Sequence, residues 1–161
     1  MEIELRRRRI NLMTLGSGVI AFGVWSVLKT FLYIWVDSYV FEFPDMPPEL
    51  IGVANAIAYA LLGFLVLIDS ALRTYIGLSA RSVGMGKKKS RTYIILAAMI
   101  LAFSVVSWVL ILLNHKYNRM ENQSVLDYYV SLFVEMSSTA ILAEMVYTAL
   151  RVRKLEKLLE G

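Results

Sequence analysis

Long hydrophobic stretches dominate the pattern of polar and apolar positions in this sequence. They cover residues 10–36, 50–72, 93–113 and 125–150. A helix needs about 20 mostly apolar residues to cross the hydrocarbon core of a bilayer, because each residue advances it by only about 1.5 Å. Backbone polar groups meet no water there, so these stretches must form continuous helices. The pattern predicts an all-α, polytopic integral membrane protein in which residues 1–161 form one four-transmembrane-helix bundle.

The polar segments that flank these stretches differ strongly in charge. Of the 17 Lys and Arg residues, 14 lie before the first stretch, between the second and third, or after the fourth. The two opposite connections hold only Lys116 and Arg119. Basic residues beside membrane helices remain in the cytoplasm. We therefore predict a multi-pass protein of the cytoplasmic or inner membrane, with cytoplasmic N- and C-termini and a cytoplasmic basic loop at 73–92.

Where the basic residues lie determines which partner the net charge of +4 indicates. Because they adjoin the predicted spans, they favour anionic lipid headgroups and not nucleic acid, at about 1 kcal/mol for each charge near the surface. The predicted lipid contacts are Arg6, Arg7, Arg8, Arg9, Lys87, Lys88 and Lys89. Residues 151–161 continue in an amphipathic pattern, which predicts a short helical tail that lies on the headgroups or pairs with a neighbouring helix.

Small residues recur at helical spacing in the first two spans. Membrane helices associate through close packing at such residues, because lipid gives no hydrophobic gain for their contact. The residues are Gly16, Gly23 and Thr30 in the first span, and Gly52, Ala56 and Ala60 in the second. Both sets predict helix-packing faces.

Two charged residues are predicted at matching depth below the outer surface, Lys29 in the first span and Glu135 in the fourth. Ionisable groups inside a membrane are costly and usually face a partner or water. Hydroxyl groups share the face of Glu135, which extends this intramembrane polar patch to Ser131, Ser138 and Thr139. The patch is interpreted as an ion or proton relay or as an outward-facing pocket for a charged ligand. The alternatives are a structural ion pair that fixes helix register, or a Lys29 side chain that reaches the outer interface without pairing.

A second polar cluster is predicted nearer the cytoplasmic side. Asp69 and Arg73 are four residues apart and therefore neighbours on one helix face. Glu144 lies at similar depth in the fourth span, on the face opposite Glu135. It is interpreted as a partner of Arg73, as a contact to a second copy of the chain, or as a residue solvated at the interface.

Several kinds of chemistry are excluded by residue counts. The chain has no Cys and one His, so it can form neither disulfides nor a Cys-ligated or multi-His metal centre. Lys88 stands where a phosphate-binding loop requires Ser or Thr. We therefore predict no metal and no cofactor, and no sequence motif indicates an enzyme.

Three functional hypotheses are compatible with the sequence. The first is a small channel or transporter that acts as a homo-oligomer through its intramembrane charges. The second is a non-catalytic accessory or assembly subunit that packs against a larger membrane partner. The third is a membrane-embedded enzyme acting on lipid or quinone.

Overall fold

Four α-helices make up the computed structural model of the chain, which describes residues 2–37, 47–88, 90–117 and 125–160. They are α1 (Glu2–Asp37), α2 (Pro48–Gly84), α3 (Thr92–Tyr117) and α4 (Val125–Glu160). The prediction of an all-α protein is confirmed.

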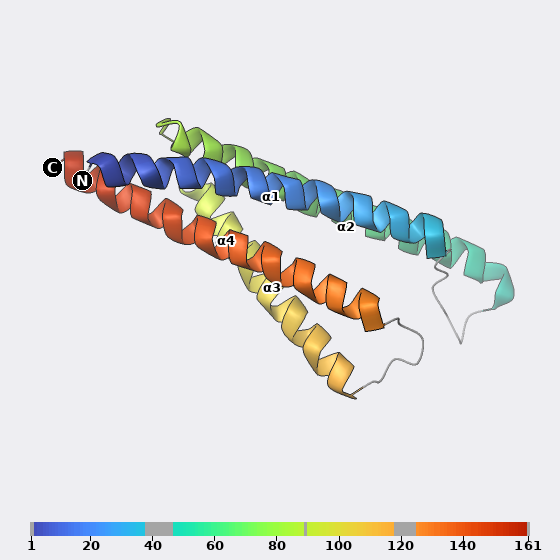
Figure 1. Cartoon of the computed structure of the whole chain (residues 1–161). Coiled ribbons are helices and arrows are strands. Elements are labelled where there is room, and N and C mark those ends of the chain that lie inside the picture. The colour runs from blue at the N-terminus through green and yellow to red at the C-terminus, as the bar shows by residue number, and fades with distance from the viewer. Residues whose placement is uncertain (1, 38–46, 89, 118–124, 161) are drawn as a thin grey trace.

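The helices are packed together at one end of the molecule and diverge toward the other (Figure 1). α1 and α2 lie side by side along most of their length, whereas α3 and α4 separate from them. Both chain termini lie at the packed end, beside the C-terminus of α2 and the N-terminus of α3. We call this the basic end, because it carries Arg6–Arg9, Lys87, Lys88 and Arg151–Lys157, and we call the opposite one the far end.

Three of the helices, as far as their residues are described, are long and apolar enough to cross a membrane: Glu2–Leu32, Glu49–Gly84 and Thr92–Leu110. The chain is therefore a membrane protein by length and composition. α4 is not among the three, and its described part carries Glu135 and Glu144 among several hydroxyl residues. The predicted fourth crossing remains a prediction.

The helices extend beyond the apolar stretches at the basic end. α1 begins at Glu2, eight residues before the predicted first span, and α4 continues to Glu160. The connection predicted at 73–92 is shorter in the structure, because α2 continues to Gly84 and α3 begins at Thr92. No proline interrupts residues 73–84, so the helix continues as long as it can pack against α1.

Gly86 ends α2 in a backbone conformation that favours glycine, with φ of +85°. The N–H of Gly86 donates to the carbonyl of Val83, and the N–H of Lys87 donates to that of Ser82. This hydrogen-bond pattern closes helices at a left-handed residue. Gly86→Ala should lower the free energy of unfolding by about 1 kcal/mol, whereas Gly86→Asn should cost less. Thermal unfolding in mild detergent measures both, and equal melting temperatures for wild type and Gly86→Ala would contradict the prediction.

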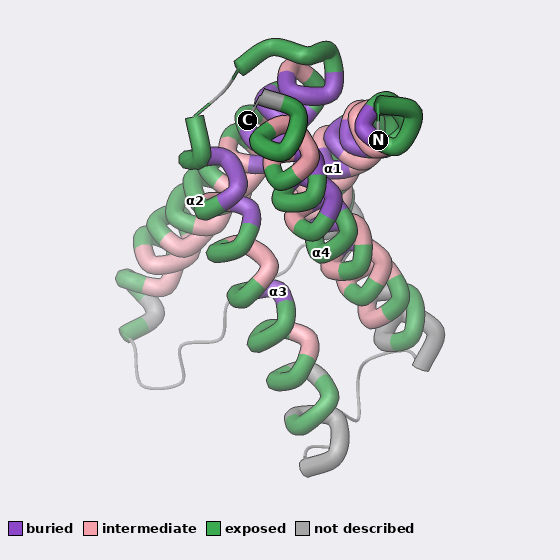
Figure 2. The backbone as a smooth tube through the Cα atoms, turned by 90° about the vertical axis from the view of Figure 1, so that its left-hand side faces the viewer, coloured by how far each residue is buried: buried purple, intermediate pink, exposed green. Residues whose placement is uncertain are grey.

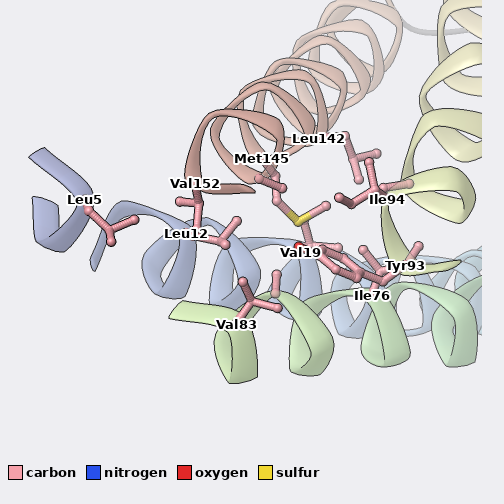
Figure 3. Close-up of a cluster of buried hydrophobic side chains, with 13 residues drawn as sticks. Leu5, Leu12, Val19, Ile76, Val83, Tyr93, Ile94, Leu142, Met145 and Val152 are labelled. Atoms are coloured by element: carbon pink, nitrogen blue, oxygen red, sulfur yellow. The ribbon is translucent and has the colours of Figure 1, made fainter. Parts of the chain in front are cut away.

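The hydrophobic core is confined to the basic end (Figure 2). All four helices contribute to it, and Leu12, Ile76, Tyr93 and Met145 are at most 1% exposed. Figure 3 shows Val19 and Met145 facing Ile76 and Tyr93 across the centre of this cluster. Toward the far end, large apolar side chains are exposed on every helix. Such a surface suits lipid, which solvates apolar groups without any need for burial.

Glycines bring the backbones of α1 and α2 into direct contact. A Cβ atom added at Gly16 would lie 2.7 Å from the carbonyl oxygen of Gly77, and one at Gly84 would lie 2.7 Å from that of Arg9. A Cβ at Gly23 would lie 3.2 Å from that of Arg73. Gly16 and Gly23 thus lie in a packing face of α1. We call the contact between α1 and α2 at Gly16, Gly23, Gly77 and Gly84 the glycine seam. The predicted second face is not used in the same way, since nothing lies within 4 Å of a Cβ added at Gly52.

Candidate functional site

Arg73 links three helices near the middle of the molecule. Its side chain is only 11% exposed, and its Nε donates to Oδ2 of Asp69 at 2.8 Å. Its Nη1 donates to Oγ of Ser138 on α4, also at 2.8 Å. Gly23 of α1 leaves room for the aliphatic part of the side chain. We call Asp69, Arg73 and Ser138 the Arg73 bridge.

The composition of the Arg73 bridge limits its chemistry. A guanidinium does not lose its proton in proteins, so Arg73 cannot relay one. Both of its hydrogen-bond partners come from the chain itself, and this compensates the cost of placing a charge away from water. The arrangement therefore suits a structural contact that fixes the position of α4 relative to α2, and it does not suit a proton pathway.

The structure brings together two members of the predicted cytoplasmic-side cluster and leaves the third exposed. Asp69 and Arg73 lie together, but the third member of the bridge is Ser138, which the sequence had grouped with Glu135. Glu144 is exposed on α4. Ser138 and Glu144 are six residues apart, which places them about 120° from each other around a helix, so a face that contacts Arg73 includes only one of them.

Lys29, Glu135 and Thr139 of the predicted Lys29–Glu135 patch are half-buried, whereas Ser138 is buried in the Arg73 bridge. Lys29, Glu135 and Thr139 belong to the halves of α1 and α4 that diverge toward the far end (Figure 1). The hydroxyl of Thr139 donates to the backbone carbonyl of Glu135 at 2.8 Å, a local contact within the helix. The side chain of Ser131 lies outside the described residues. Pairing of Lys29 with Glu135 remains a prediction.

The predicted lipid-contact residues are in two different situations. Arg6 and Arg7 are exposed, as are Lys87 and Lys88, and Lys89 lies outside the described residues. Arg8 and Arg9, by contrast with Arg6 and Arg7, contact other residues of the chain. Arg9 donates from Nη2 to Oε1 of Glu156 at 2.8 Å. Arg8 lies 4.0 Å from a carboxylate oxygen of Glu4, and its guanidinium is 5.8 Å from the ring centroid of Tyr147.

Sequence reasoning missed a further group of basic residues as a possible binding site. Arg91, Arg153, Lys154 and Lys157 line a hollow between the start of α3 and the end of α4. The sequence pattern uses them to orient the chain in the membrane and assigns 151–161 to an amphipathic tail. The spacing of Arg153 and Lys157, four residues apart, does show that both lie on one helix face, but nothing in the sequence shows that α3 begins beside them.

Among the described residues, no group of three His, Cys, Asp or Glu side chains is arranged to hold a metal ion. No known protein family, curated protein or solved structure matches the chain.

Proposed function

We propose that this chain is a four-span membrane protein with both termini in the cytoplasm, and that it is a non-catalytic subunit that assembles with a second copy of itself. The position of both termini at one end of the molecule supports an even number of crossings (Figure 1). The basic residues at that end support its cytoplasmic orientation. α1, α2 and α4 have 36, 37 and 36 residues. At about 1.5 Å per residue they exceed the about 30 Å hydrocarbon core, so their basic ends project from it.

The observation that carries the assembly proposal is the exposure of Glu144 on α4. Phe133, Ala140 and Arg151 are exposed beside it and share its side of α4. We call these four residues the outer face of α4. Ionisable groups that face lipid are costly and usually find a partner, and a partner helix that donates a hydrogen bond to Glu144 removes this cost. Ala140 allows such a helix to approach closely.

A second small-residue stripe supports assembly independently. Gly52, Ala56 and Ala60 are exposed along α2, and the space around Gly52 is open. The comparable glycines of α1 are covered by α2 within the chain. α2 therefore offers the packing features of a membrane helix interface on a side that no other described helix covers.

Assembly is tested by the mass of the purified protein in mild detergent. We expect twice the mass of the 18.3 kDa protomer. Ala140→Leu and Glu144→Gln should each raise the dissociation constant of the dimer tenfold or more, because the first blocks close approach and the second weakens the interhelical hydrogen bond. Ala98→Leu is the matched control, since Ala98 is exposed on α3. A wild-type monomer, or equal effects of Ala98→Leu and Ala140→Leu, would refute assembly through this face.

A second candidate function is an oligomeric channel or transporter. The half-buried Lys29 and Glu135 in the diverging halves of α1 and α4 favour it, because charges at such depth are typical of ion pathways. Flux in liposomes that Glu135→Gln abolishes, with the fold intact, would establish this function instead. Among the described residues no arrangement favours an enzyme acting on lipid or quinone, and we do not propose one.

A further inference from the structure

Two hollows adjoin at the basic end, where the start of α3 meets the end of α4. The larger has a volume of about 520 Å³, and its basic lining residues are Arg91, Arg153, Lys154 and Lys157. The smaller, of about 210 Å³, adds Lys87 and Lys88. Arg91, Arg153 and Lys157 line both. We call the two together the basic groove.

The charges of the basic groove are strongly unbalanced. Its lining contains six basic side chains and one carboxylate, that of Glu156. Oε1 of Glu156 already accepts a hydrogen bond from Arg9 at 2.8 Å, so a cation outside the lining offsets this carboxylate. Arg153 is held at the wall by the ring of Tyr93, whose centroid is 6.0 Å from the guanidinium carbon. A guanidinium group can donate two parallel hydrogen bonds to the oxygens of one phosphate, so this lining suits a phosphate-bearing anion.

One wall of the groove is apolar, which distinguishes lipids from free anions. Ile94, Ile95 and Leu150 form this wall. Ile95 is 60% exposed and Leu150 is 54% exposed. Ile94 and Ile95 belong to the first turn of a helix apolar enough to cross a membrane, Thr92–Leu110. A free phosphate gains nothing from such a wall, whereas a phospholipid has acyl chains that would cover it.

Local structure explains how distant basic residues meet here. The turn closed by Gly86 places Lys87 and Lys88 directly after α2, and Arg91 directly precedes α3. The N-terminus of α3, where the helix dipole is positive, therefore adjoins the groove. On α4, Arg153 and Lys157 lie on one face, because they are four residues apart.

We propose that the basic groove binds one anionic phospholipid, with its phosphate among Arg91, Arg153 and Lys157 and an acyl chain along Ile95 and Leu150. This is a defined site, unlike diffuse attraction of lipid to exposed arginines such as Arg6 and Arg7. It rests on the proposed function only in that the basic end must lie at a membrane surface.

Lipid adducts counted by native mass spectrometry of the whole protein test the site. The protein is titrated in mild detergent with diphosphatidylglycerol, phosphatidylglycerol or phosphatidylcholine. We expect one tightly retained molecule of either anionic lipid and none of phosphatidylcholine. Lys154→Gln combined with Lys157→Gln should weaken retention about tenfold or more. Both lysines are exposed, so the fold should be unaffected.

A matched variant separates a site from general attraction to positive charge. Arg6→Gln combined with Arg7→Gln removes the same charge at the same end, from two exposed residues of α1, and should change retention less than twofold. Equal losses in the two double variants would overturn the proposal. Lys157 lies about 140° around α4 from Glu144, and the dimer mass in the same spectra tests the proposed assembly separately.

A competition arm separates lipid from free anions. Pyrophosphate and glycerol phosphate at millimolar concentration should fail to displace the bound lipid, and Ile95→Ser should weaken lipid retention severalfold. Displacement by either free anion together with no effect of Ile95→Ser would show a soluble-anion site and overturn the proposal.

Discussion

Gly77→Ala should destabilise the protein by about 2 kcal/mol, because the added methyl group collides with α1. A Cβ atom at Gly77 would meet the carbonyl oxygen of Gly16 and the side chain of Ile20 at less than contact distance. A backbone carbonyl cannot rotate away as a flexible side chain does, so the two helices must move apart. Gly77→Leu should prevent native packing of the glycine seam altogether. The midpoint of thermal unfolding in mild detergent, followed by circular dichroism, measures both effects.

Gly63→Ala is the matched control for the glycine seam. Gly63 lies on the same helix, and nothing is found within 4 Å of a Cβ atom added there. Alanine favours helix over glycine by up to about 1 kcal/mol, so this variant should be equally stable or more stable than wild type. If Gly63→Ala and Gly77→Ala shifted the midpoint equally, the close approach of α1 and α2 would not be the cause.

Removing one member of the Arg73 bridge should also be costly. Asp69→Asn leaves the guanidinium of Arg73 away from water without its carboxylate, and we expect a loss of about 3 kcal/mol. Arg73→Met should cost somewhat less than Asp69→Asn. The carboxylate that it leaves unpaired is 34% exposed and can reach solvent or headgroups. Ser138→Ala removes one hydrogen bond to a charged group and should cost about 1.5 kcal/mol. Unfolding in mild detergent measures all three variants.

The Glu4–Arg8 pair is a control within the chain for the Asp69–Arg73 pair. Glu4 and Arg8 are also four residues apart, but they lie at the exposed start of α1, 4.0 Å from each other. Glu4→Gln should cost less than about 0.5 kcal/mol. The double variant Asp69→Asn with Arg73→Met should be more stable than the sum of the single losses predicts, because it leaves no buried charge. Additive losses would contradict a coupled bridge.

The helical architecture could be predicted because it depends on local properties of the chain. Apolar stretches of sufficient length determine where α1, α2 and α3 lie, whatever their neighbours. The ends were harder to predict. Residues 73–84 carry two arginines and two glycines and were predicted as a loop, yet they form the last turns of α2. Contact with α1 stabilises them, and that contact is invisible in the sequence of α2 alone.

The candidate sites were predictable only where their members share a helix. Asp69 and Arg73 are neighbours because helix geometry makes them so. Ser138 was assigned to a different patch, since its orientation depends on how α4 is rotated against α2. The basic groove joins Lys87, Arg91 and Arg153, which belong to different segments, and only the packing of α3 on α4 brings them together.

The sequence by itself determined that this protein is helical, that it belongs in a membrane, and that its positive charge gathers at one end. Only the tertiary structure decided which small residues bring helices together, which charges meet, and where the basic groove opens. The physical reason is that lipid-facing helices are apolar on every side. Periodicity therefore does not reveal which face of each helix turns inward, and close contacts between side chains and backbones decide it instead.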